Sequence, residues 1–203
     1  MQVIQDTLAQ VKLGTKTTFR NLTMFPLLNG GSGQPDYLTL DEALARGCVH
    51  ITEVSAGGSV PELKFVNESD HRVLLLDGEE LVGAKQNRVL NLTILAPANR
   101  TLVIPVSCVE AGRWTRWSIE FTSAMRTHYA GGRARKMSQV TESLRFTGQR
   151  RSDQSAVWAD IEAKAERLEA PSPTQAMAAI YEKHATSIED YVRAFSVTDG
   201  QVG

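Results

Sequence analysis

The chain has 203 residues, of which 42% are hydrophobic and 22% charged, a composition typical of globular proteins and not of disordered chains. Its formal net charge of −1 gives no overall field that would attract a membrane surface or nucleic acid. Two cysteines are too few for a disulfide framework, and no apolar run approaches the roughly 20 residues that span a bilayer. Because the first residues also lack the features of a secretory signal, we expect a cytoplasmic protein without membrane contact.

The charge is unevenly distributed along the chain. Residues 113–151 contain nine Lys or Arg residues and two acidic residues, so this segment is basic and the remainder is acidic. We expect a small anion to bind near the basic segment. Nucleic acid is not the expected partner, because the basic residues are spaced as on a solvated surface.

The first third of the sequence predicts two helices and two strands. A short helix is expected over residues 1–13, and residues 17–28 alternate as in a strand, with Pro26 best placed on a sheet edge. Residues 29–33 are rich in glycine and predict a loop. Thr39 and Glu42 form a capping box that begins a second helix, which ends at Gly47 and is followed by a strand over residues 48–54.

The middle of the chain predicts five short strands joined by tight turns, over residues 61–66, 72–76, 81–84, 88–95 and 100–109. Asp77-Gly78 is typical of a two-residue hairpin turn, because both positions tolerate positive φ. Short connections favour antiparallel pairing, since parallel strands need a crossover helix. The predicted fold class is therefore α+β, with a mainly antiparallel core that resembles a β-sandwich.

The last third predicts a loop and two amphipathic helices. Residues 131–136 are expected to form an exposed loop. The first helix places one apolar stripe at Val157, Trp158, Ile161, Ala165 and Leu168. The second begins with Ser172 as its N-cap and Pro173 at its first position. We predict one domain over residues 1–170 and a helical extension over 171–203, which packs on the domain or on a second subunit of a homo-oligomer.

The first candidate functional segment is the polar stretch between Asp77 and Arg88. On an extended strand Glu80, Gln86 and Arg88 would point to one face, and Asn87 to the other. A carboxylate, an amide and a guanidinium together suit a ribose hydroxyl, an amide edge and a phosphate. The alternative is that the stretch is an exposed turn between two strands.

The second candidate segment runs from Cys108 to Trp114, where an apolar strand ends in a glycine turn. Arg113 and Trp114 suit an anion and a stacked aromatic ring. The alternative is a Trp114 packed in the core, with Arg113 paired to Glu110. For Cys108 a buried, unreactive thiol is favoured over a nucleophile, because no histidine lies in a catalytic motif. The four histidines are scattered, so neither a metal site nor a cofactor is predicted.

Three motifs resemble a known family when they are taken in order: GEELVGAKQNRV at residues 78–89, PVSCVEAGRW at 105–114 and DQSAVWADI at 153–161. They are similar to the bacterial domain family associated with ADP-ribosylglycohydrolases and rhodanese-phosphatases. The resemblance covers residues 17–168 and implies a context of ADP-ribose and NAD-derivative metabolism, without an established activity. The matching positions are Glu80, Gln86, Arg88, Cys108, Glu110, Arg113, Trp114, Gln154 and Trp158.

Three functions remain open at this stage. The leading hypothesis is a recognition domain for ADP-ribose or a related nucleotide derivative. In it Arg88 and Arg113 bind phosphates, Glu80 binds a ribose hydroxyl, Gln86 or Asn87 binds a polar edge, and Trp114 stacks on a base. The second is a hydrolase of such a ligand with Glu80 or Glu110 as general base. The third is an interaction or oligomerisation module that uses the C-terminal helices.

Overall fold

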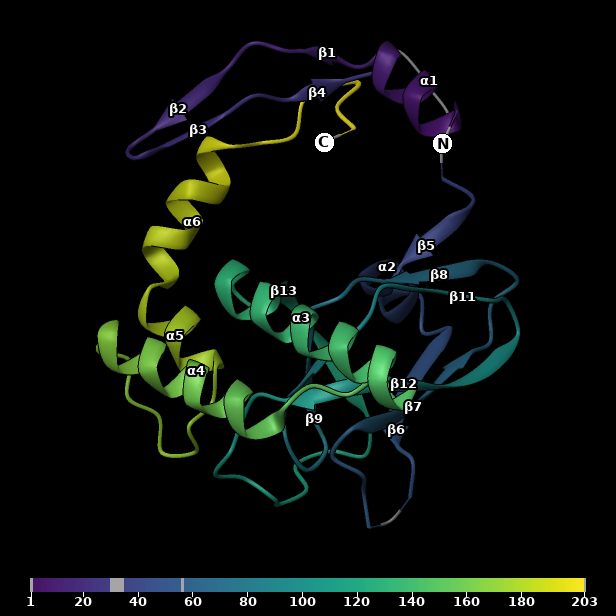
Figure 1. The fold of residues 1–203 in the computed structure, drawn as a ribbon, viewed down its shortest axis with the longest axis vertical. Helices are drawn as coiled ribbons and strands as arrows, with labels where there is room; N and C mark the ends of the chain where they lie inside the picture. Colours follow the sequence, from purple (N-terminus) through teal and green to yellow (C-terminus); the bar gives the residue numbers. More distant parts are fainter. Residues whose placement is uncertain (1, 30–34, 56, 203) are drawn as a thin grey trace. The chain divides into compact units, whose positions relative to one another are not determined.

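The computed structural model describes residues 2–29, 35–55 and 57–202, so the predicted loop over residues 29–33 lies almost entirely outside the described residues. The chain forms two compact units: a main unit, Asp36–Ile180, and a terminal unit made of Met1–Pro35 and Tyr181–Gly203. Helices and strands are both well represented, and nearly all strand pairs are antiparallel (Figure 1), as predicted for an α+β fold. The predicted boundary at residue 170 stays a prediction.

A six-stranded antiparallel sheet forms the centre of the main unit, in the order β13-β9-β10-β12-β7-β6. The two edge strands of this sheet meet at a bridge between Thr52 and Glu120, so the sheet curls until its edges touch. The strands are β6 (Val49–Glu53), β7 (Glu62–Asn67), β9 (Glu79–Gly83), β10 (Arg88–Leu90), β12 (Arg100–Cys108) and β13 (Phe121–Thr127).

A smaller sheet has the order β11-β8-β5 and contains the one parallel pair among the described strands, β5 with β8. Its strands are β5 (Tyr37–Thr39), β8 (Arg72–Leu75) and β11 (Ile94–Ala96). Helix α2 (Leu40–Ala45) follows β5 directly, and its Thr39–Glu42 capping box is confirmed. Gly47 ends the helix with a φ of 64°, as predicted.

The hydrophobic core lies between the two sheets and α2. Side chains from the inner faces of both sheets are fully buried there, among them Leu38, Leu63, Phe65, Val73, Leu75, Leu81, Leu90, Ile104 and Phe121. Burial alternates along β6, where Val49, Ile51 and Glu53 point inward. A charged residue therefore shares the inward-facing side of a core strand.

Helices α3 (Ala130–Thr147) and α4 (Gln154–Arg167) lie side by side on the main unit (Figure 1), and α4 packs on β12. The prediction of an exposed loop over residues 131–136 was wrong, because these residues form the first turns of α3. Lys136 in that segment is fully buried, and its ammonium donates to Asp77 and to the Leu90 carbonyl. The buried hydrogen bonds of the Lys136 ammonium hold this segment in place.

The Asp77-Gly78 hairpin prediction was also wrong. β8 pairs with β11 and β5, whereas β9 pairs with β10 and β13, so the turn carries the chain from one sheet to the other. Asp77 is buried and its carboxylate is bound by Lys136 and Arg133, which holds the crossing in place. The predicted strand over residues 88–95 is likewise divided into β10 and β11, which belong to different sheets.

The C-terminal part of the main unit differs from the prediction at its second helix. α5 (Ala178–Lys183) begins six residues after Ser172, and a separate helix, α6 (Ala185–Ala194), follows it. Residues 172–177 instead run beside the end of β12, where Gly112 donates to the Thr174 carbonyl and Met177 donates to the Val109 carbonyl. These bonds to the chain that follows β12 replace the first helical turn that Ser172 and Pro173 predicted.

The terminal unit contains α1 (Gln2–Gln10), two small hairpin-like pairs and α6. The single strand predicted over residues 17–28 is replaced by three: β2 (Thr17–Phe19), β3 (Leu22–Met24) and β4 (Leu27–Leu28), the last paired with β1 (Lys12–Leu13). Arg20 turns the chain with a φ of 50° and pairs with Asp190 of α6.

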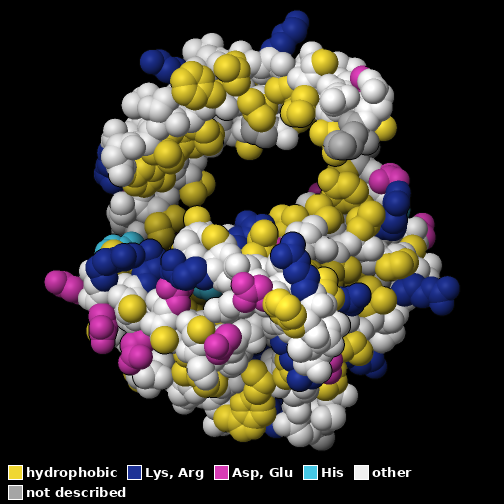
Figure 2. All heavy atoms as spheres, viewed as in Figure 1, with side chains coloured by type: hydrophobic (Ala, Val, Ile, Leu, Met, Phe, Trp, Pro, Cys, Tyr) yellow, Lys and Arg dark blue, Asp and Glu magenta, His cyan; other side chains and the backbone are white. Residues whose placement is uncertain are grey.

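Much of the hydrophobic side-chain surface of the terminal unit is exposed (Figure 2). Among the described residues, none of the helices combines the length and the apolar character that crossing a membrane would need.

Candidate functional site

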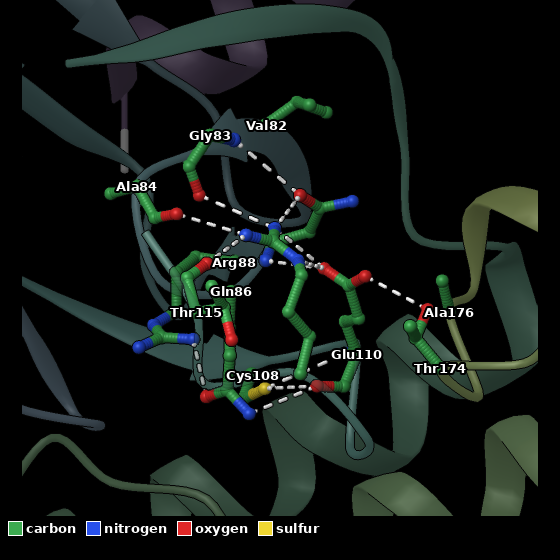
Figure 3. Close-up of polar contacts among 12 residues, drawn as sticks. Val82, Gly83, Ala84, Gln86, Arg88, Cys108, Glu110, Thr115, Thr174 and Ala176 are labelled. Atoms are coloured by element: carbon green, nitrogen blue, oxygen red, sulfur yellow. Dashed lines mark hydrogen bonds and ion pairs between the residues drawn. The ribbon is translucent and has the colours of Figure 1, made fainter. Parts of the chain in front are cut away.

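The two polar segments singled out in the sequence come together in the main unit (Figure 3). The turn between β9 and β10 lies against the end of β12: the backbone N–H of Asn87 donates to Glu110 Oε2 at 3.1 Å, and Gln86 Nε2 donates to the Glu110 carbonyl at 3.0 Å. Val109 N–H also donates to the Asn87 carbonyl. The structure therefore brings the two polar segments into direct contact.

Arg113 is the centre of this contact and is almost completely buried, with 4% of its surface exposed. Its Nε donates to Glu110 Oε2 at 2.8 Å, and its Nη1 donates to the carbonyls of Ala84 and Thr115. Its Nη2 donates to Asn87 Oδ1 at 3.0 Å. Every nitrogen of this guanidinium is therefore bonded inside the protein, which fixes the β9–β10 turn and the chain after β12.

Glu110 accepts hydrogen bonds on both carboxylate oxygens. Oε2 accepts from Arg113 and Asn87, and Oε1 accepts from the Thr174 hydroxyl at 2.9 Å. Burial alone would raise the pKa of Glu110, but the bonds from Arg113, Asn87 and Thr174 together hold it below its ordinary value. The carboxylate is stabilised in its ionised form, which makes it a weak proton acceptor. Its role as a general base stays a prediction.

Glu80 lies apart from this group. The register of the hairpin places Leu81 opposite Arg88 and Glu80 opposite Val89, so Glu80 and Arg88 lie on opposite faces of the sheet. The expectation that Glu80, Gln86 and Arg88 share one face was wrong, because the chain turns at Ala84, with a φ of 40°, and breaks the alternation. Glu80 is buried and pairs with Arg126 of β13 at 2.5 Å.

A second buried group lies at one end of the curled sheet. Arg88 lies on the same inward face of β10 as Leu90. Cys108 lies on the same inward face of β12 as Val106. Both are fully buried. Burial lowers the pKa of the Arg88 guanidinium and raises the pKa of the Cys108 thiol, since burial destabilises each charged form. The raised pKa agrees with an unreactive thiol at Cys108.

Arg88 is bonded far less completely than Arg113. Its Nη1 donates to Gln86 Oε1 at 2.9 Å, but Nε and Nη2 are buried and have no hydrogen-bond partner among the described residues. The neighbouring Cys108 and then Glu53, which was missed from the sequence, favour the charged form of Arg88 and partly oppose the lowering of its pKa by burial. Both carboxylate oxygens of Glu53 are also buried and without a hydrogen-bond partner in the described part of the chain. The alternating pattern of β6, in which Val49 and Ile51 face the core, indicates that Glu53 faces the core as well.

Trp114 and Lys85 lie beside this group. The centre of the Trp114 ring is 5.7 Å from Arg88 Cζ and 5.0 Å from Lys85 Nζ, and about half of the Trp114 surface is exposed. Trp114 is therefore not packed in the core. The pairing of Arg113 with Glu110, which belonged to the same alternative, is observed. Trp117 covers Arg113 instead, with Arg113 Cζ 3.8 Å from the centre of its ring.

Arg88 and Glu53 together offer donors and acceptors with unused capacity, beside a half-exposed aromatic ring. Buried polar groups in proteins are nearly always hydrogen-bonded, so the unpartnered atoms of Arg88 and Glu53 mark this corner as the candidate site. A hydroxyl group suits it chemically, because it accepts from a guanidinium and donates to a carboxylate. Within the described ranges, no three His, Cys, Asp or Glu side chains are grouped so that they could hold a metal ion.

The model of the ARPP-1 family, described as the ARG and Rhodanese-Phosphatase-superfamily-associated Protein domain, matches residues 10–203. This chain belongs to the ARPP-1 family. The match extends past Leu168, so the C-terminal helices are part of the family domain and not an addition to it. Neither a curated protein nor a solved structure matches the chain.

Proposed function

We propose that the main unit of this ARPP-1 protein is a recognition domain for ADP-ribose or a related nucleotide derivative. The family name links the domain to ADP-ribosylglycohydrolases, and thus to an ADP-ribose context. The observation that carries the proposal is the incomplete bonding of two buried, oppositely charged side chains, Arg88 and Glu53. Leaving such groups without partners costs free energy, which a bound ligand recovers.

Each part of the ligand has a counterpart in the proposed site. Arg88 donates from Nε and Nη2 to a phosphate or to a ribose hydroxyl, and Glu53 accepts from a ribose hydroxyl. The exposed half of the Trp114 ring stacks on the base, and Lys85 beside it supplies a second positive charge for a phosphate. Arg113, Glu110, Asn87 and Gln86 hold the turn that positions Arg88. Arg113, which the sequence analysis gave to a phosphate, is a positioning residue in this proposal.

Calorimetric titration of the full chain with ADP-ribose tests the proposal. We expect saturable binding by the wild type, and a loss of at least about tenfold in affinity for Glu53→Gln, whose amide keeps the shape but not the charge. The matched control is Glu62→Gln, on neighbouring β7 and outside the proposed site. The absence of heat at millimolar ADP-ribose, or equal affinities for the two variants, would contradict the proposal.

A further inference from the structure

A second polar hollow lies where α3 begins beside the last turns of α4. It has a volume of about 400 Å³ and is lined by Tyr129, Ala130, Gly131, Arg135, Asp160, Ala163, Lys164 and Arg167. Three cationic side chains and one carboxylate face this space. On the face shown in Figure 2, Lys and Arg side chains gather over this part of α3 and α4.

The start of α3 is suited to an anion. An α-helix leaves its first amide N–H groups without intrahelical acceptors, and its dipole makes that end positive. Tyr129 is the N-cap residue of this 18-residue helix and makes no capping hydrogen bond with its side chain. The first turn contains no acidic residue, in contrast to α2, which has Asp41 and Glu42 there. No residue of the first turn itself therefore neutralises the positive end of α3; the nearest carboxylate is Asp160 of α4.

The side chains around this helix start are held in place. Asp160 accepts from the Tyr129 hydroxyl at 2.7 Å and pairs with Arg135, so the one carboxylate in the hollow is already neutralised. Lys164 lies 4.6 Å from the centre of the Tyr129 ring. A Cβ at Gly132 would lie 2.4 Å from His128 Nε2 and 2.8 Å from Asp160 Oδ2, so glycine is required for this close approach.

A buried histidine gives the independent sign of a ligand. A smaller hollow of about 140 Å³ shares Arg135 and Asp160 with the larger one, and is also lined by His128 and Lys136. His128 is 1% exposed, and neither ring nitrogen has a hydrogen-bond partner among the described residues. A polar side chain so completely buried is normally hydrogen-bonded, so a small polar group or a water molecule in the hollow beside it would satisfy it.

We infer that the hollow at the start of α3 is a second anion-binding site, which takes the phosphoryl group of a small molecule. The phosphoryl oxygens accept from the first backbone N–H groups of α3 and from Lys164 and Arg167 at the rim. Arg135, paired with Asp160, forms the back of the site. The site is separate from the Arg88–Glu53 group in its elements and in its side chains.

The test uses the full chain and inorganic pyrophosphate as the probe. Two-dimensional NMR during a pyrophosphate titration should show saturable shifts of the Gly131 and Gly132 amide signals and of the His128 ring signals. The double variant Lys164→Gln/Arg167→Gln should bind about tenfold more weakly, whereas Arg145→Gln, in the last turn of α3 and outside the lining of the hollow, should bind within about twofold of the wild type. Shifts absent at about 10 mM pyrophosphate, or equal affinities for all three proteins, would overturn the inference.

A further variant separates binding from folding. A Cβ at Gly131 would lie 3.6 Å from Arg135 Nη1, so Gly131→Ala fits the fold but places a methyl group in the hollow. We expect a higher melting temperature, because alanine favours the helix, together with weaker pyrophosphate binding. Unchanged binding by this variant would contradict the inference. Orthophosphate and ribose 5-phosphate titrations then distinguish a free phosphate from a phosphate ester as the natural ligand. Because these signals come from the start of α3 and from His128 just before it, their outcome does not depend on ADP-ribose binding at Arg88.

Discussion

Two buried arginines in the same unit differ in how completely they are bonded, and the difference separates a structural role from a binding role. Arg113 uses all its nitrogens on Glu110, Asn87 and backbone carbonyls. Arg88 is even more deeply buried and donates to Gln86, while two of its nitrogens find no partner among the described residues. The position of a polar motif in the sequence does not distinguish these roles, but the hydrogen bonds of each side chain do.

The largest expected effect comes from breaking the complete network. Arg113→Met leaves the Glu110 carboxylate buried without its cation, which costs about 3–5 kcal/mol in the free energy of unfolding. Urea denaturation measures this loss. The control Arg116→Met removes an exposed guanidinium from the same loop and should change stability by less than about 0.5 kcal/mol. A loss below about 1 kcal/mol for Arg113→Met would show that the network does not hold the fold.

His128 is another buried polar side chain whose polar atoms have no hydrogen-bond partner in the described part of the chain, and it predicts a dependence of stability on pH. Burial, and next the charge of Lys136, lower the pKa of His128 from 6.5 to about 4. As the pH falls, the unfolded chain therefore binds a proton before the folded protein does, and stability present above pH 6.5 is lost progressively toward pH 4. From pH 7 to pH 5 we expect this histidine to cost about 2 kcal/mol.

Unfolding measured at both pH values tests this expectation, with His128→Asn as the comparison. The variant should lose less stability than the wild type over the same interval, because it has no imidazole to protonate. An identical loss in both proteins would mean that His128 does not titrate in this way.

Trp114 tests the proposed binding role of the group around Arg88. Trp114→Ala removes the half-exposed ring beside Arg88 and should weaken ADP-ribose binding about tenfold, because base stacking contributes about 1–3 kcal/mol. Trp117→Ala is the matched control, since Trp117 lies over Arg113 and outside the proposed site. Equal losses of affinity in the two variants would contradict the proposed stacking of the base on Trp114.

The smallest expected effect on stability belongs to Arg88. Arg88→Met gives up one hydrogen bond to Gln86 but also removes two buried donors that have no partner in the described part of the chain. Among the described residues no ion pair joins Arg88 to Glu53 as one joins Arg113 to Glu110, so the free energy of unfolding should change by less than about 1 kcal/mol. Urea denaturation beside Arg113→Met provides the measurement. A loss as large as that of Arg113→Met would mean that Arg88 is structural, and the distinction between the two arginines would fail.

Local signals in the sequence predicted much of the fold. The capping box at Thr39, the end of α2 at Gly47 and most strands of the main unit depend on residues close together in the chain, and they are confirmed. The predictions of a hairpin at Asp77-Gly78 and of an exposed loop over residues 131–136 were wrong for one shared reason. Asp77 and Lys136 bind each other across 59 residues, and neither local pattern contains that contact.

The residues of the candidate site could be predicted only where they lie in a local motif. The polar motifs identified Arg88, Glu110 and Arg113, and the structure brings their segments together. Glu53 was missed because it ends an ordinary core strand far from both motifs, and its meeting with Arg88 depends on the curling of the sheet. Burial was also not foreseen, since motifs of charged residues suggest surface and these side chains are inside.

The most direct test of the account compares the two arginines during one titration. The Nε–H signals of buried arginines are observable in ¹H–¹⁵N NMR spectra, and ADP-ribose can be added to the full chain in steps. We predict that the Arg88 signal shifts saturably while the Arg113 signal stays in place, because Arg113 Nε is already bonded to Glu110. An unmoved Arg88 signal at saturating ADP-ribose, or an equal shift of both signals, would contradict it.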